Sequence, residues 1–201
     1  MNLLLDVIPT TLEVGGELYK INAGFRESIL FELMMQDREL SDRDKINMAI
    51  SIYFEDNVPD DIEAAVDQII WFYKCGKEDQ ESSSSNGGEQ DHDQETSSPK
   101  QIYSFEEDDS YIYAAFLSQY GIDLQDIEFL HWWKFKALFH SLEETNKIVK
   151  IMEYRAMKIH PEMSKQEKEF YKSMKRLYAL PDNRTEEEKE RDFHNSLAKI
   201  I

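Results

Sequence analysis

Residues 127–139 of the chain read IEFLHWWKFKALF, the densest run of large apolar side chains among its 201 residues. On a helical wheel these side chains cover almost the whole circumference. A helix that is apolar all round is either fully buried or half buried, with its other side offered to a partner. Both interpretations stay open, because Trp and Tyr are also enriched among interface anchors. The run predicts a long helix from Ile127 to Leu142, with Asp123 as its N-cap.

Further helices are expected on both sides of this run, because apolar residues recur three and four positions apart and capping residues precede them. Ser104 and Ser164 each begin a capping-box pattern, in which a serine is followed by a glutamate three positions later. Gly121 and Pro161 are typical of helix ends. Seven helices are expected, at 25–36, 42–57, 61–75, 105–120, 127–142, 143–160 and 165–180. A further helix at 186–200, which has few apolar residues before Phe193, would be the eighth.

A β-hairpin is predicted at the N-terminus. Thr11–Val14 and Glu17–Ile21 alternate apolar and polar residues around the pair Gly15-Gly16. Adjacent glycines supply the positive φ angles that a tight hairpin turn requires. Because an isolated hairpin is marginal in water, its apolar face must pack on helices. That face comprises Leu12, Val14, Tyr19 and Ile21.

An acidic segment divides the chain. Residues 77–100 hold no sizeable apolar side chain, seven acids against two lysines, and a run of serines followed by Gly87-Gly88. Such a segment cannot offset the entropy lost on ordering it, so we expect a disordered linker or insertion. It separates residues 1–76, a hairpin with three helices, from a helical part at 101–201. The predicted fold class is therefore mostly α, a multi-helix bundle with a short N-terminal hairpin and a disordered acidic insertion.

The charge balance excludes several classes of function. The chain carries 41 acidic and 23 basic residues, a formal net charge of −18. This excess argues against non-specific nucleic-acid binding and against docking on an anionic membrane. No stretch approaches the roughly 20 apolar residues that span a bilayer, and the opening MNLLLD lacks the basic start of a signal peptide. The one cysteine rules out an internal disulfide and favours a reducing, cytosolic setting.

One motif has the spacing of a metal site. Glu128 and His131 form Glu-x-x-His, which di-iron helix bundles use in two copies with two further glutamates. A second copy is missing, since Ala137, Met157 and Arg191 stand three positions before the remaining histidines of the helical segments. We therefore expect His131 to be a histidine at the edge of the core.

The remaining candidates for chemistry are weak. Asp91-His92-Asp93 has metal-compatible side chains but lies in the acidic segment, where no rigid cage is expected. Cys75 has no evident base partner, which indicates an inert thiol. The chain has no Gly-rich phosphate loop, no nucleophile elbow and no Cys or His pair at zinc spacing. We expect no catalytic residue, no cofactor and no metal.

Four stretches together resemble a protein family from tailed bacteriophages of Gram-positive hosts. This is the gene-product-fifteen family of siphophage tail modules. The most distinctive are YIYAAFLSQYGIDL at 111–124 and EFLHWWKF at 128–135. IMEYR at 151–155 and VGGELYKIN at 14–22 complete the pattern. The resemblance covers nearly the whole chain, with the acidic segment as a tolerated insertion.

The resemblance implies a non-catalytic tail assembly chaperone that acts in the cytoplasm of the bacterial host while phages assemble. Its partners would be the tape measure protein and also the major tail protein. The alternative is a minor structural protein that stays in the tail or connector of the virion. An acidic exterior and apolar contact residues, methionines among them, fit a chaperone for long apolar helices. The residues expected to line or support the partner surface are Tyr111, Phe116, Trp132, Trp133 and Phe135.

Overall fold

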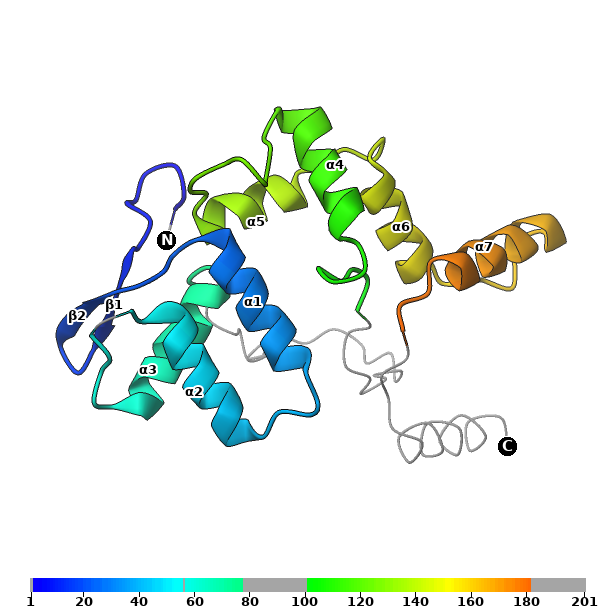
Figure 1. Cartoon of the computed structure of the whole chain (residues 1–201). Helices are drawn as coiled ribbons and strands as arrows, with labels where there is room; N and C mark the ends of the chain where they lie inside the picture. Colours follow the sequence, from blue (N-terminus) through cyan, green and yellow to red (C-terminus); the bar gives the residue numbers. More distant parts are fainter. Residues whose placement is uncertain (1, 56, 78–100, 182–201) are drawn as a thin grey trace, which may run out of the picture.

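The structure, a computed structural model of the chain, describes residues 2–55, 57–77 and 101–181. Within these ranges it holds seven helices and one antiparallel hairpin, which confirms the predicted fold class (Figure 1). The insertion at 78–100 and the predicted helix at 186–200 lie outside the described residues. The elements are β1 (Thr11–Val14), β2 (Glu17–Lys20), α1 (Phe25–Gln36), α2 (Asp42–Tyr53), α3 (Ile62–Tyr73), α4 (Asp109–Tyr120), α5 (Trp132–His140), α6 (Lys147–Ala156) and α7 (Lys165–Leu177).

The helices form a chain of contacts that leads from the hairpin to α7. Helices α1, α2 and α3 pack in sequence, and β1 lies against α3. Helix α5 contacts both α1 and α4, so it joins the first three helices to the rest (Figure 1). Helix α6 packs on α4, and α7 packs on α6 at the end of the molecule opposite the hairpin.

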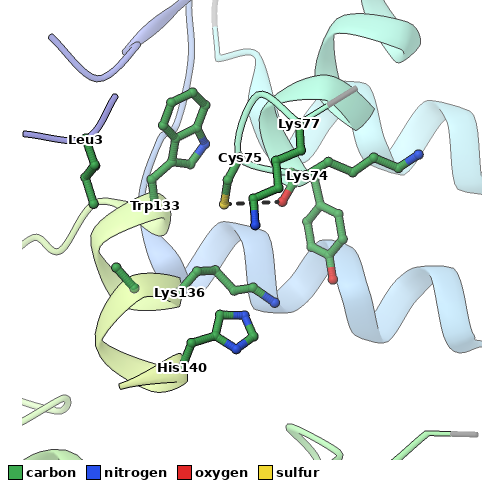
Figure 2. Close-up of a pocket in the computed structure, with 9 residues that line it drawn as sticks. Leu3, Lys74, Cys75, Lys77, Trp133, Lys136 and His140 are labelled. Carbon is green, nitrogen blue, oxygen red and sulfur yellow. Dashed lines mark hydrogen bonds between the residues drawn. The ribbon is translucent and has the colours of Figure 1, made fainter. Parts of the chain in front are cut away.

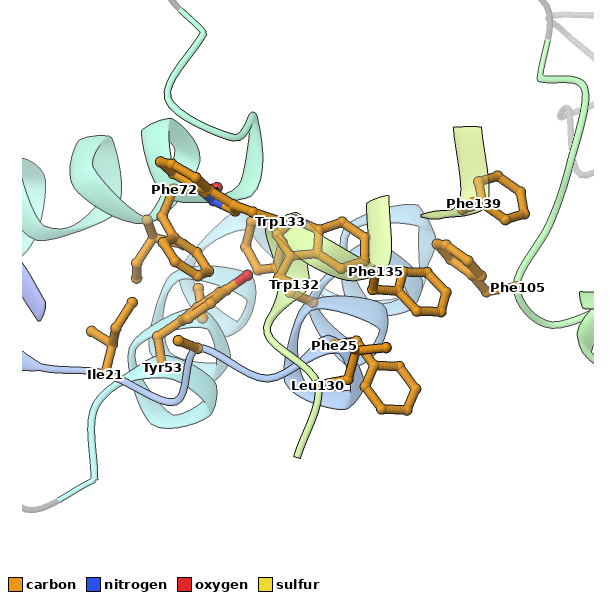
Figure 3. Packing of buried hydrophobic residues seen from close by; sticks show 14 of the residues in the cluster. Ile21, Phe25, Tyr53, Phe72, Phe105, Leu130, Trp132, Trp133, Phe135 and Phe139 are labelled. Atoms are coloured by element: carbon orange, nitrogen blue, oxygen red, sulfur yellow. The ribbon is translucent and has the colours of Figure 1, made fainter. Parts of the chain in front are cut away.

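One hydrophobic core joins the two sides of the 78–100 segment. Its buried cluster includes side chains from the hairpin, α1 to α3, α4, α5 and α6, with the aromatic rings of α5 in the middle (Figure 3). The backbone also pairs across this junction. Phe25 N donates to Leu130 O at 2.9 Å, and Trp132 N donates to Ala23 O at 2.9 Å. The two helical parts therefore share one core.

The hairpin has the register that its sequence predicts. Thr11 pairs with Lys20 and Val14 with Glu17, around a turn in which both glycines have positive φ. Three residues of the predicted apolar face are buried and Tyr19 is half-buried. This face packs on α3, which gives the short hairpin the support it needs.

The predicted long helix at 127–142 is wrong in its bounds, because helix α5 begins only at Trp132 and ends at His140. The backbone of 130–132 pairs instead with 23–25, and His131 has a non-helical ψ of 138°. Pairing with a segment far away in the sequence outweighs the local helical pattern, which extends five residues too far toward the N-terminus.

Two other helix starts also differ from the prediction. The Ser104 hydroxyl accepts from the backbone N–H groups of Glu106 and Glu107, but this organises a turn, and α4 begins later, at Asp109. The helix expected from 143 begins at Lys147, after Asn146. By contrast, Ser164 caps α7 in a complete capping box as predicted, and Gly121 ends α4 with a φ of +66°. Ser41 and Asp61 cap α2 and α3.

Candidate functional site

Two adjacent tryptophans cap the C-terminal end of α3 with hydrogen bonds. The Trp132 indole donates to Tyr73 O at 2.9 Å, and the Trp133 indole donates to Phe72 O at 2.7 Å. The last carbonyls of a helix have no partner within the helix, so they need donors from elsewhere. Trp132 also stacks on the Tyr73 ring, with centroids 5.4 Å apart. The start of α5 is therefore fixed to the end of α3 by hydrogen bonds and by ring packing.

His131 caps α5 and contacts the backbone of Pro9, in the segment that precedes β1. Its Nδ1 accepts from Trp133 N at 3.1 Å, and its Nε2 lies 2.9 Å from Pro9 O. This pair of contacts requires the neutral ring with its proton on Nε2. Burial lowers the pKa of His131, and the positive charge of Lys134 acts in the same direction. The sequence predicted a histidine at the edge of the core. Both ring nitrogens of His131 instead have hydrogen-bond partners, so the ring is more constrained than predicted.

The structure places four of the five predicted partner-binding residues in the core. Phe116, Trp132 and Phe135 are completely buried, and Trp133 is 5% exposed. Phe135 stacks on both Phe116 and Trp132. Figure 3 shows the Trp132 and Phe135 rings of α5 among neighbouring aromatic rings. Tyr111, at the start of α4, is half-buried. Of the five, Tyr111 alone is only partly buried, and it packs against the edge of the core.

A pocket lies where the end of α3 meets α5. It has a volume of about 550 Å³. Figure 2 shows the side chains of Lys77 and Lys136 extending into one space beside the His140 ring. Trp133 forms one wall, and Cys75 adjoins it. The complete lining is Leu3, Tyr73, Lys74, Cys75, Lys77, Trp133, Lys136, Ala137 and His140.

The pocket is electropositive in a chain that is strongly acidic overall. Its lining holds three lysines and a histidine but no aspartate or glutamate. Burial lowers the pKa of His140, and the charges of Lys136 and Lys77 lower it further. The same two lysines act against burial, which raises the pKa of Cys75. The fields of Lys77 and Lys136 therefore overlap within the pocket.

Lys136 is held in place by aromatic rings. Its ammonium group lies 5.2 Å from the centroid of the Trp132 ring and 3.5 Å from the Tyr103 hydroxyl. The charge of Lys136 acts on Glu32 of α1, which accepts a hydrogen bond from the hydroxyl of the pocket-lining Tyr73. Burial raises the pKa of Glu32, while the Tyr73 hydroxyl and Lys136 lower it.

A short apolar turn projects from the N-terminus beside this pocket. Leu4 and Leu5 are 91% and 82% exposed, and Val7 is 89% exposed. The turn is nevertheless organised, because Asn2 Oδ1 accepts from Leu4 N at 2.9 Å and Asn2 O accepts from the N–H of Asp6. Backbone and polar side chains thus hold three large apolar side chains in water.

The comparisons with known proteins give one match, a model of the family described as Bacteriophage Gp15 protein, over residues 4–180. The chain belongs to this family. A search of curated proteins and a search of solved structures each find no match. Among the described residues of this Gp15 family member, no helix is long and apolar enough to cross a membrane.

The stretches that carry the resemblance occupy the parts of the Gp15 fold where the helices meet. The 14–22 stretch forms the hairpin turn and β2, and 128–135 includes the crossing of α5 with the 23–25 segment. The 111–124 stretch covers most of α4 and its glycine end. The 151–155 stretch lies in α6 and ends at the buried Arg155.

A buried ion pair is the main feature that sequence reasoning missed. Arg155 donates to both carboxylate oxygens of Asp108, at 2.6 and 2.9 Å, and the two residues are 7% and 1% exposed. Arg155 also donates to Ile102 O and Tyr178 O, at 3.0 and 2.6 Å. A sequence signal did exist, since Arg155 stands four positions after the buried Ile151 and so shares its face of α6.

The metal-like motifs do not come together as a site. Glu128 is exposed, whereas His131 faces the Pro9 carbonyl from the core. Within the ranges that the structure describes, no group of three or more Asp, Glu, His or Cys side chains could hold a metal ion. The Asp91-His92-Asp93 motif lies outside these ranges.

Proposed function

We propose that this Gp15 family protein is a non-catalytic tail assembly chaperone, which binds the tape measure protein, and also the major tail protein, in the host cytoplasm during tail morphogenesis. The family match over residues 4–180 is the observation that carries this proposal. The net charge of −18 supports it, because like charges keep loaded complexes apart.

The N-terminal turn is the best-exposed apolar contact surface in the described chain. A chaperone for long helices with apolar stripes needs apolar side chains that are accessible before the partner arrives. Leu4, Leu5 and Val7 meet this requirement, as each is more than four-fifths exposed. We assign the first contact with the tape measure protein to this turn.

The buried aromatic residues receive a supporting role in this proposal. Trp132, Trp133, Phe116 and Phe135 fix α5 to α3 and α4, and so maintain the surface around the N-terminal turn. Of the five residues expected to line or support the surface, Tyr111 is the one to which we assign a lining role, because it is only partly buried. A Trp133→Ala variant that folds normally and still keeps the tape measure protein in solution would show that this ring has no part in binding.

Co-expression with the tape measure protein tests the proposal. The wild-type chain should raise the fraction of tape measure protein in the supernatant and co-purify with it. A variant with Leu4, Leu5 and Val7 replaced by Ser should lose most of this effect while unfolding at the same urea concentration as the wild type. Leu177→Ser is the matched control, because Leu177 is 65% exposed on α7, far from the turn.

The composition of the virion separates a chaperone from a structural component. A chaperone leaves the tail before it is complete, so mass spectrometry of purified virions should find the protein absent or far below the copy number of tail proteins. Stoichiometric amounts would instead identify it as a minor structural protein of the tail or connector.

A further inference from the structure

We propose that the pocket between the end of α3 and α5 binds an acidic segment of a partner polypeptide, with a carboxylate beside an apolar side chain. This inference rests on the proposed function as an interaction protein, because it names the part of a partner that the pocket would hold. It concerns a different place from the N-terminal apolar turn, although Leu3 borders both.

The first argument is charge complementarity. Lys77 and Lys136 come from different segments of the chain and extend into the same space (Figure 2). Cations after a helix C-terminus interact favourably with its dipole, which accounts for Lys77 at the end of α3. Lys136 lies in the middle of α5, away from that dipole, and is held there by its contacts with the Trp132 ring and the Tyr103 hydroxyl. An anion in the pocket would interact with both lysines at once.

The second argument is the apolar part of the wall. Trp133, Ala137 and Leu3 line the pocket together with the stems of the lysines. A small hydrated anion would leave this surface uncovered, whereas an aspartate or glutamate next to an apolar residue would cover it while its carboxylate meets the lysines. Leu3 is 43% exposed, so part of its side chain is available for such a contact.

His140 gives the pocket a spectroscopic reporter. Its pKa is lowered by burial and by the charges of Lys136 and Lys77. A bound carboxylate offsets these positive charges and favours the protonated ring. Binding should therefore move the titration of the His140 ring protons, followed by NMR, to higher pH.

A fluorescently labelled short peptide of alternating aspartate and leucine tests the proposal on the full chain by fluorescence anisotropy. The matched peptide has asparagine in place of every aspartate. We expect the acidic peptide alone to bind, with an affinity that falls as salt rises. Lys77→Gln should weaken binding roughly two- to fivefold, in the range of single exposed ion pairs, and Lys136→Gln by at least as much.

Lys134→Gln is the control on the same helix, because Lys134 is exposed on α5 and does not line the pocket. It should leave binding unchanged. Lys136 also contacts Trp132, so its variant could lose stability, but Lys77 is exposed and its substitution keeps the test valid. We therefore expect weaker peptide binding by Lys77→Gln and unchanged binding by Lys134→Gln. On peptide binding, the titration of His140 should move to higher pH.

Four outcomes would overturn the assignment. Equal binding of the asparagine peptide, or displacement by acetate at the same carboxylate concentration, would exclude an acidic polypeptide as the specific ligand. If the chain associates with itself when no peptide is present, and Lys77→Gln abolishes this association, the occupant of the pocket is a second copy of the chain. If the peptide does not bind but the tape measure protein still co-purifies, the pocket is not a peptide site and the proposed function is unaffected. If the peptide does not bind and the tape measure protein does not co-purify, both proposals are wrong.

Discussion

Arg155 and Asp108 form a two-point ion pair in the interior, with N–O distances of 2.6 and 2.9 Å. This pair links three segments, since Arg155 lies in α6, Asp108 precedes α4, and Arg155 also donates to the carbonyl of Tyr178 after α7. Asp108 accepts a further hydrogen bond from Ser104 N at 2.9 Å. The polar atoms of both side chains are thus paired inside the protein.

Asp108→Ala should be strongly destabilising. It leaves the Arg155 guanidinium buried without its counter-ion, and breaking one side of a buried pair costs about 3–5 kcal/mol. Asp109→Ala, at the exposed first residue of α4, should cost less than about 1 kcal/mol. Urea unfolding of the two variants measures the difference. Equal losses of stability in the two variants would show that negative charge at the start of α4 stabilises the fold, and that the Arg155–Asp108 pair does not add to it.

Gly76→Ala should destabilise the junction of α3 and α5. Gly76 has a φ of +67°, and a Cβ there would lie 3.1 Å from Cη2 of Trp133 and 3.3 Å from Cζ2 of Trp71. Gly121→Ala is a matched control, because Gly121 has a φ of +66° with open space around it. Both should lose about 1–2 kcal/mol from the left-handed backbone. Gly76→Ala should lose more in thermal unfolding, and the excess reports the crowding between the two indoles.

Trp132→Phe should lower the free energy of unfolding by about 1–3 kcal/mol, because it removes the donor to the Tyr73 carbonyl at a completely buried side chain. Trp71→Phe is the comparison. Trp71 is half-buried, and the described part of the chain offers its indole N–H no hydrogen-bond partner. Its substitution should have a smaller effect in urea unfolding. Similar losses for both would mean that ring size, and not the hydrogen bond, fixes this junction.

The stability of the fold should decrease as the pH falls below about 6.5, the ordinary pKa of histidine. The pKa of His131 is lower in the folded state, so the unfolded chain takes up the proton first and is favoured. The contribution is complete above 6.5 and is lost as the pH falls toward the folded pKa. His131→Asn should be less stable at pH 7 but should show a flatter dependence between about pH 7 and 5.5. His140→Asn controls for the second histidine with a lowered pKa. An unchanged slope in His131→Asn would contradict the assignment.

Local patterns predicted the parts of the fold that local chemistry determines. Gly15-Gly16 predicted the hairpin, Ser164 a helix start, and Gly121 a helix end, because each acts within a few residues of itself. The start of α5 was predicted wrongly because its backbone pairs with residues 23–25, which no periodicity in the run can reveal.

The candidate site was even less visible in the sequence. Lys77 and Lys136 are unremarkable where they stand, and they form a pocket only because the Trp132 and Trp133 indoles bring α5 against the end of α3. The aromatic run lies at the centre of the core, which is one of the two interpretations that the sequence leaves open, whereas its role in partner binding stays a prediction. Contacts between distant segments, and not composition, produce this pocket.

The capping of α3 by the two indoles has a consequence for biosynthesis. Tyr73 and Phe72 emerge from the ribosome 59 and 61 positions ahead of the tryptophans that bind their carbonyls. At about 5–20 residues per second, that interval lasts about 3–12 s. Throughout it the nascent N-terminal helices carry an uncovered aromatic side, so translation pauses in this interval should favour aggregation or capture by host folding factors.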